Sequence, residues 1–120
     1  MQSPYGSLFQ QCQYIQEDQY LKSDNGKYFL YLNPSGDLKI CRDSLDGEVI
    51  WSTNTAGQGE APYHLKITID GKLNLFDSHR TSLWTPPKNK DEFVNKAWIT
   101  DEGVFYAYGL FQNQIFASDS

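Results

Sequence analysis

Three stretches of the sequence carry polar side chains at every second position, a spacing that places them on one face of a strand. Carboxylate, amide and hydroxyl groups fixed on such a face can bind adjacent hydroxyl groups of a ligand, and an apolar neighbour can cover ring carbons. The same pattern is also typical of the solvated face of an antiparallel sheet, so both interpretations are kept. The residues are Asn33, Ser35, Asp37, Lys39 and Cys41; Thr68, Asp70, Lys72, Asn74 and Phe76; and Thr100, Glu102, Val104, Tyr106 and Tyr108.

The elements that must position these side chains repeat three times along the chain. Each copy has an apolar strand, a tight turn at a glycine, a second strand and a third that ends in an aromatic residue. The copies span residues 28–55, 63–84 and 95–116, with turns at Gly36, Gly71 and Gly103. We therefore predict three copies of one sheet-forming unit, whose apolar columns face inward. These columns are Leu30, Leu65 and Ala97; Leu32, Ile67 and Ile99; Leu38, Leu73 and Phe105; and Ile40, Leu75 and Ala107.

A chain of 120 residues is expected to form one domain. Three small sheets cannot each bury a face alone, so they are expected to pack around a shared axis filled by Trp51, Trp84 and Phe116. The predicted units are about 19–55, 56–87 and 88–120, with edge strands from residues 1–18, a short strand at 19–21 and a linker at 85–91. No stretch has the apolar period of a helix, so the predicted fold is all-β with pseudo-three-fold symmetry.

The sequence resembles the bulb-type (monocot, snowdrop-like) mannose-binding lectins. The resemblance rests on the three-fold repeat, on Val49-Ile50-Trp51-Ser52-Thr53-Asn54-Thr55, and on the turn segments Gly-Asp-Leu-Lys-Ile and Asp-Gly-Lys-Leu-Asn-Leu. It implies the β-prism II fold of three four-stranded antiparallel sheets. It also implies a non-catalytic lectin that holds mannose-type or related glycans on its outward sheet faces. Lectins of this family commonly exchange C-terminal strands, so residues 112–120 are expected to form a homodimer.

The family's binding motif is Gln-x-Asp-x-Asn-x-Val-x-Tyr, and this chain departs from it in every copy. The second copy keeps only Asp70 and the third only Tyr108; the lysines at 39 and 72 could occupy the neighbouring carboxylates. The second face is expected to bind sugar best, the first next and the third least. The family's internal disulfide is absent, since its positions match Gly36 and about Tyr63. The carbohydrate-binding candidates are Thr68, Asp70, Lys72, Asn74, Phe76, Asn33, Ser35, Asp37, Lys39, Thr100, Glu102 and Tyr108.

Charge and motif content favour a glycan-binding protein over other classes. The net charge of −5 and the pI near 4.8 argue against binding to nucleic acid or to an anionic membrane surface. We expect no metal site at His64 or His79, no cofactor and no enzymatic activity, because no ligand-spaced set or paired acid site is visible. The alternative is a protein-interaction module with inactive sugar sites. The chain has no visible signal peptide and no glycosylation sequon, which favours the cytoplasm and leaves secretion open.

Overall fold

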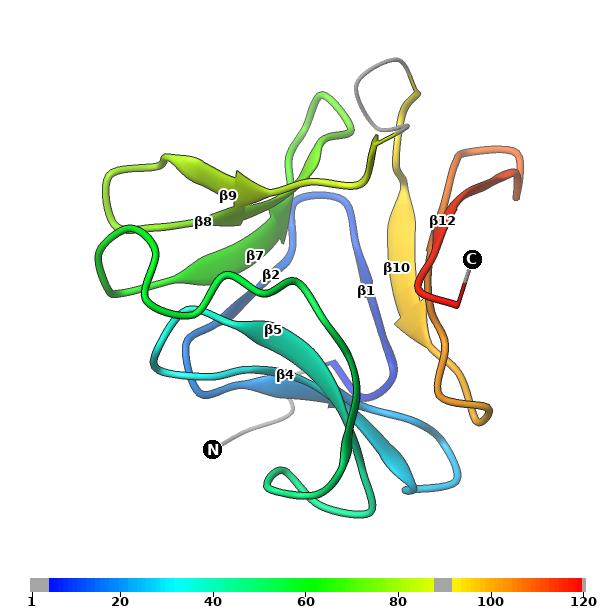
Figure 1. Ribbon diagram of the computed structural model, residues 1–120. Helices are drawn as coiled ribbons and strands as arrows, with labels where there is room; N and C mark the ends of the chain where they lie inside the picture. Colours follow the sequence, from blue (N-terminus) through cyan, green and yellow to red (C-terminus); the bar gives the residue numbers. More distant parts are fainter. Residues whose placement is uncertain (1–4, 88–91, 120) are drawn as a thin grey trace.

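The computed structural model describes residues 5–87 and 92–119. Within these ranges every element is a β-strand and no α-helix is present, so the prediction of an all-β fold is confirmed. The strands form three four-stranded antiparallel sheets that surround a central axis, the β-prism II arrangement (Figure 1). None of the described elements is an apolar helix of membrane-spanning length.

Each sheet combines three consecutive strands with one short outer strand from the N-terminal segment. The first sheet contains β3 (Tyr20–Lys22), β4 (Tyr28–Leu32), β5 (Leu38–Arg42) and β6 (Val49–Ser52). The second contains β2 (Tyr14–Gln16), β7 (His64–Ile67), β8 (Leu73–Phe76) and β9 (Ser82–Trp84). The third contains β1 (Leu8–Gln10), β10 (Lys96–Ile99), β11 (Phe105–Tyr108) and β12 (Gln114–Ala117). The N-terminal segment therefore visits all three sheets in turn and ties them together.

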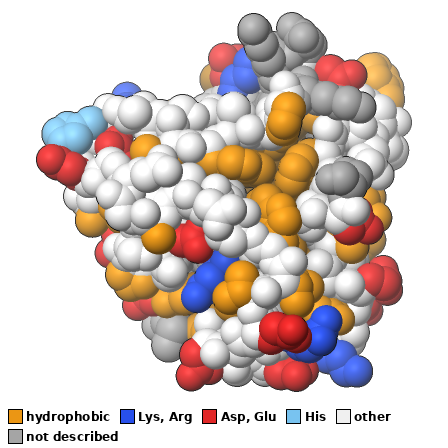
Figure 2. Space-filling view, viewed as in Figure 1, with side chains coloured by type: hydrophobic (Ala, Val, Ile, Leu, Met, Phe, Trp, Pro, Cys, Tyr) orange, Lys and Arg blue, Asp and Glu red, His pale blue; other side chains and the backbone are white. Residues whose placement is uncertain are grey.

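The inner faces of the sheets form one core. Every residue of the four predicted inward columns is fully buried, because each apolar column lies on the inner side of the pleat. Trp51, Trp84 and Phe116 meet as expected, with ring centroids 5.4–5.9 Å apart. They are half-buried rather than fully enclosed. In the view of Figure 2, hydrophobic side chains gather near the centre of the molecule.

The three turns require glycine for the same structural reason. Each glycine has a positive φ, and a Cβ added to it would lie 2.3–2.7 Å from the nearest atom of an aromatic ring at or just before the start of another copy. The rings close a cycle around the molecule, which links each turn to a neighbouring sheet. The pairs are Gly36 with Tyr63, Gly71 with Phe93, and Gly103 with Tyr28. At Gly36 and Tyr63, the positions matching the resembled family's disulfide, the chain instead packs a ring on a glycine.

Several local expectations need adjustment. The short strand predicted at 19–21 is found at Tyr20–Lys22, one residue later. Cys41, placed with the outward-facing residues by the alternation, is fully buried, and burial raises the pKa of its thiol. Cys12 is exposed, and both thiols are free. Residues 88–91 of the predicted linker lie outside the described residues.

Candidate functional site

The first motif position in each unit builds the turn that follows it. The side-chain oxygens of Asn33, Thr68 and Thr100 each accept a hydrogen bond from the backbone N–H four residues ahead, at 3.0–3.1 Å. The backbone N–H of each of the three residues donates back to the carbonyl of the same partner residue, at 2.9–3.0 Å. Thr100 is buried within this arrangement. A ligand that bonded to these oxygens would have to share them with the turn, so their role in sugar binding stays a prediction.

On the first sheet, the outward polar groups are occupied by contacts within the protein. The carboxylate of Asp37 accepts hydrogen bonds from Ser52 Oγ at 2.8 and 2.9 Å, from Thr53 Oγ1 at 3.2 Å and from Thr55 N at 3.3 Å. The sequence had suggested that Lys39 could occupy the Asp37 carboxylate. Among the described residues, Asp37 bonds instead to residues 52–55. Ser35 donates its hydroxyl to Asn33 Oδ1 at 2.7 Å.

The rest of the first sheet's outer face is covered. Tyr31 lies there, buried, and donates its hydroxyl to Asp18. Burial and this hydrogen bond raise the pKa of Tyr31 to about 12. Leu45 and Asp46 of the β5–β6 loop lie beside Tyr31 and Lys39 and leave a hollow of about 410 Å³. The β5–β6 loop therefore covers part of this face and lines the hollow that remains.

On the second sheet, the candidates are more accessible. Asp70 is exposed at the turn and accepts the Thr68 hydroxyl. Asn74 Oδ1 accepts a hydrogen bond from Ser82 Oγ at 2.7 Å. Phe76 packs beside His64, with ring centroids 5.2 Å apart. Asn74 and Phe76 lie half-buried on the outer side of β8, as predicted from the alternation, and Lys72, also half-buried, directly precedes this strand.

The third sheet's outer face is an aromatic surface. Tyr106 and Tyr108 stack with ring centroids 5.5 Å apart, and Trp98 on the neighbouring strand contacts both. Burial, with a smaller effect of Tyr106, raises the pKa of Tyr108. Val104, expected to face outward, is buried, whereas Glu102 is exposed at the turn. The face offers rings rather than carboxylates or amides.

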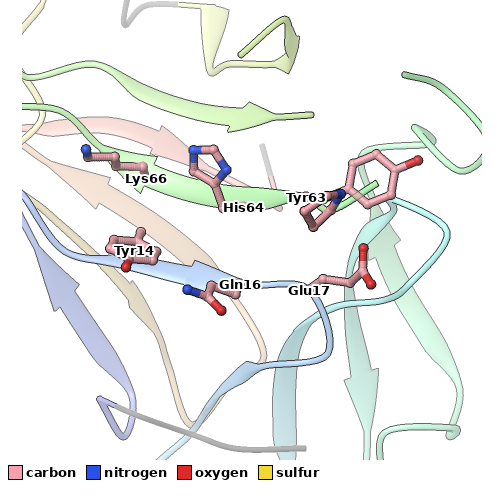
Figure 3. Close-up of a pocket in the computed structure, with 7 residues that line it drawn as sticks. Tyr14, Gln16, Glu17, Tyr63, His64 and Lys66 are labelled. Atoms are coloured by element: carbon pink, nitrogen blue, oxygen red, sulfur yellow. The ribbon is translucent and has the colours of Figure 1, made fainter. Parts of the chain in front are cut away.

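A hollow of about 570 Å³ lies on the outer face of the second sheet, where β2 pairs with β7. Figure 3 shows its side chains in a row along the two strands. Tyr14 and Lys66 are opposite each other at one end, Gln16 and His64 lie in the middle, and Glu17 and Tyr63 are at the other end. Pro62 completes the lining. The volume is within the usual range for small-molecule sites, roughly 300–1,000 Å³.

The chemistry of this hollow is mixed. The Tyr14 ring is 40% exposed and meets the His64 ring edge-on, with centroids 6.2 Å apart. Burial lowers the pKa of His64, and the charges of Lys66 and Arg80 lower it further. Among the described residues, Glu17 Oε1 is buried without a hydrogen-bond partner. The hollow thus offers a ring surface, donors and a free acceptor.

These lining residues were not among the candidates from the sequence. His64 was considered only as a metal ligand, and no described cluster of three His, Cys, Asp or Glu side chains could hold a metal. A usable signal was present, because Tyr14 and Gln16 flank buried Ile15, and His64 and Lys66 flank buried Leu65. The period of two that located the other outward residues also locates these four, but not Glu17 and Tyr63, which have the parity of the buried Ile15 and Leu65. That β2 pairs with β7, however, required the structure.

Comparison with known proteins identifies the fold. No model of a known protein family matches the sequence. A protein of Acanthamoeba polyphaga mimivirus named "Putative lectin L633" is 33% identical over 60 residues. That match covers 50% of this chain and 30% of the length of the viral protein.

Solved structures match over nearly the whole chain. A Marasmius oreades lectin superposes with a TM-score of 0.82 at 21% identity, covering 98% of this chain and 93% of that one. A monomeric monocot mannose-binding lectin from Gastrodia elata gives 0.81 at 18% identity, covering 96% and 98%. The mannose-specific agglutinin from snowdrop, Galanthus nivalis, solved with methyl-α-D-mannoside, gives 0.73 at 16%, covering 86% and 89%. The resemblance to the monocot mannose-binding lectins is thus confirmed at the level of the fold.

Proposed function

We propose that this protein is a non-catalytic lectin that binds carbohydrate on the outer face of its second sheet. The observation that carries the proposal is the hollow between β2 and β7, which sits beside the predicted positions on β8. Lys66 in the hollow is paired with Asn74 in the sheet register, so the two sets of residues form one continuous surface. A glycan could extend along it from Glu17 towards the turn at Asp70.

The lining suits a ring that carries hydroxyl groups. The half-exposed ring of Tyr14 can cover the apolar side of a pyranose, and Gln16 and Glu17 can bond its hydroxyls. Two of the proteins with the same fold, those from Gastrodia elata and snowdrop, are described as mannose-binding or mannose-specific lectins. Mannose and its oligosaccharides are therefore the first ligands to test. That these proteins are lectins supports the expectation that the bound sugar is not chemically altered.

We further propose that the second face binds best because it combines Asp70 and Asn74 with the adjoining hollow. The first face ranks below it, since Asp37 is held by Ser52 and Thr53. The third ranks last for bonding to hydroxyls, because Val104 stands where the family has an amide.

Calorimetric titration of the wild type, Asp70→Ala and Asp37→Ala with mannose and a mannose oligosaccharide tests this ranking. Loss of one charge-assisted hydrogen bond should weaken binding by Asp70→Ala roughly tenfold to a hundredfold. Asp37→Ala should leave the affinity unchanged. If the wild type binds no sugar on a glycan array, with calcium or with chelator, the protein-interaction module becomes the better account. If sugar binds but neither variant alters it, the motif positions are not the site.

We also propose a homodimer that forms through the C-terminal segment. In this chain β12 pairs with β11 of its own third sheet, and strand exchange between two copies would preserve that pairing. The Gastrodia elata lectin with the same fold is described as monomeric, so the assembly has to be measured. Light scattering at high micromolar concentration should give twice the chain mass of 13.8 kDa. The monomer mass would contradict the dimer.

A further inference from the structure

The hollow on the second sheet places the basic side chains of Lys66 and His64 together, with Glu17 at the other end, in a protein that is acidic as a whole. The chain carries a net charge of −5, yet Lys66 and His64 both line this one surface. The charge of Arg80, in the β8–β9 loop, also acts on His64. Among the described residues, Lys66 forms no ion pair. Its charge is therefore available to a ligand.

The opposite end of the hollow carries an acceptor without a donor. Glu17 Oε1 is buried and has no hydrogen-bond partner among the described residues. A buried carboxylate oxygen that is left unbonded is unfavourable, and a ligand hydroxyl would relieve this. Gln16, next to it, can either donate or accept. This end of the hollow suits hydroxyl groups.

The distance between the two ends suits a sugar. Lys66 is paired with Tyr14, and the N–H of Glu17 bonds to the carbonyl of Tyr63, so the hollow spans three residue steps, from Tyr14 to Glu17. At the rise of a strand this is about 10 Å. A monosaccharide, or one unit with part of the next, fits this length with its ring over Tyr14.

We propose that this hollow selects an acidic sugar, a uronic acid whose carboxylate pairs with Lys66 and whose hydroxyls bond Gln16 and Glu17. The inference rests on the proposed function and specifies the ligand class of the same site. Lys66 and His64 supply donors for the carboxylate, while Tyr14 covers the ring. The equivalent position on the first sheet is the buried Tyr31, and on the third sheet Trp98, so neither offers this charge.

Two methyl glycosides that differ only at C6, methyl β-glucuronide and methyl β-glucoside, test this directly. The wild type should bind the glucuronide roughly tenfold or more tightly than the glucoside, as one charge-assisted bond allows. Lys66→Met keeps the apolar stem and should reduce that ratio to near one. Lys27→Met, which removes an exposed lysine between β3 and β4 of the first sheet, is the matched control and should leave the ratio unchanged. Added salt should lower the ratio for the wild type only.

The outcomes separate the two proposals. Equal binding of both glycosides, or a preference that survives Lys66→Met, overturns the acidic-sugar inference while sugar binding itself stands. Binding of neither glycoside, nor of mannose, overturns the proposed function as well. Circular dichroism and melting of each variant establish that it folds. If Lys66→Met does not fold, Lys66→Gln provides the same test.

Discussion

The first and second sheets have the same strand pairing but use their outer faces differently. Tyr31 and Lys66 hold equivalent positions, each paired to the strand that follows the turn. Tyr31 is buried and bonded to Asp18, whereas Lys66 lines an open hollow. On the inner side, the matching columns of both sheets are fully buried. The fold thus constrains the inner faces closely and leaves the outer faces free to differ.

The segments that follow the second strand of each unit account for much of this difference. The loop between β5 and β6 covers residues 43–48 and places Leu45 beside Tyr31 and Lys39. The loop between β8 and β9 covers residues 77–81 and is held by Asp77, whose carboxylate accepts from the N–H groups of His79 and Thr81. The longer loop of the first sheet thus lines the hollow on its outer face, whereas no residue of the shorter loop lines the hollow of the second sheet.

The largest expected effect concerns the turn glycines, a feature that all three sheets share. Gly71→Ala should lower the free energy of unfolding by about 3 kcal/mol, because a left-handed alanine costs about 1–2 kcal/mol and displacing a packed ring about 1–3 kcal/mol. The added Cβ would lie 2.3 Å from Phe93. Gly57→Ala is the matched control, since Gly57 also has a positive φ but no atom within 4 Å. Urea unfolding should show a clearly smaller loss there, and equal losses would mean that the ring contact contributes nothing.

The second prediction separates the two faces. Asp37→Ala should destabilise the protein by about 1.5–3 kcal/mol, because a charged acceptor that holds Ser52 and Thr53 is lost. Asp70→Ala should change stability by about 0.5 kcal/mol or less, as expected for an exposed residue. Thermal and urea unfolding measure both. Equal effects on stability would remove the contrast between an internally bonded face and an open one.

The smallest expected effect concerns two histidines whose pKa values are shifted in opposite directions, His64 on β7 and His79 in the β8–β9 loop. Burial, Lys66 and Arg80 lower the pKa of His64 below its ordinary 6.5, so the unfolded state binds more protons and stability falls as the pH drops below that value. The hydrogen bond to Glu60 raises the pKa of His79, so its contribution is present below the unfolded pKa and is lost as the pH rises through the folded one.

His64→Gln should therefore reduce the loss of stability on acidification, whereas His79→Gln should increase it. Urea unfolding on either side of the histidine pKa compares the slopes. The difference in slope between each variant and the wild type isolates the contribution of that histidine. The groups that face His64 are Tyr14, Gln16, Lys66, Phe76 and Arg80. If the free energy of unfolding of both variants depends on pH as it does in the wild type, the assigned directions of the two pKa shifts are contradicted.

The sequence predicted the inner architecture because local rules determine it. Alternation by two located every inward column, and the glycines marked the turns at Gly36, Gly71 and Gly103. The reason for glycine there was only half visible. A positive φ could be expected from the turn, but the ring of another unit packed on each glycine is a long-range contact that no local pattern reveals.

The candidate site was less predictable for the same reason. The polar residues of β5 and β8 were placed on the outer face, yet the partners of Asp37 come from residues 52–55, after a loop. The hollow needs β2 beside β7, which are separated by about fifty residues of sequence. The alternation predicts which way a side chain points. Which other segment of the chain packs against or bonds to that side chain depends on how the three sheets are assembled.

The most direct test of sugar binding on the second sheet is an NMR titration that follows backbone amides as a mannose oligosaccharide or methyl β-glucuronide is added. Shifts should concentrate at residues 14–17, 63–66 and 70–76, and the amides of Lys39 and Leu45 on the first sheet should stay unchanged. Saturable shifts on the first or third sheet instead, or no shifts at any ligand concentration, would contradict the account.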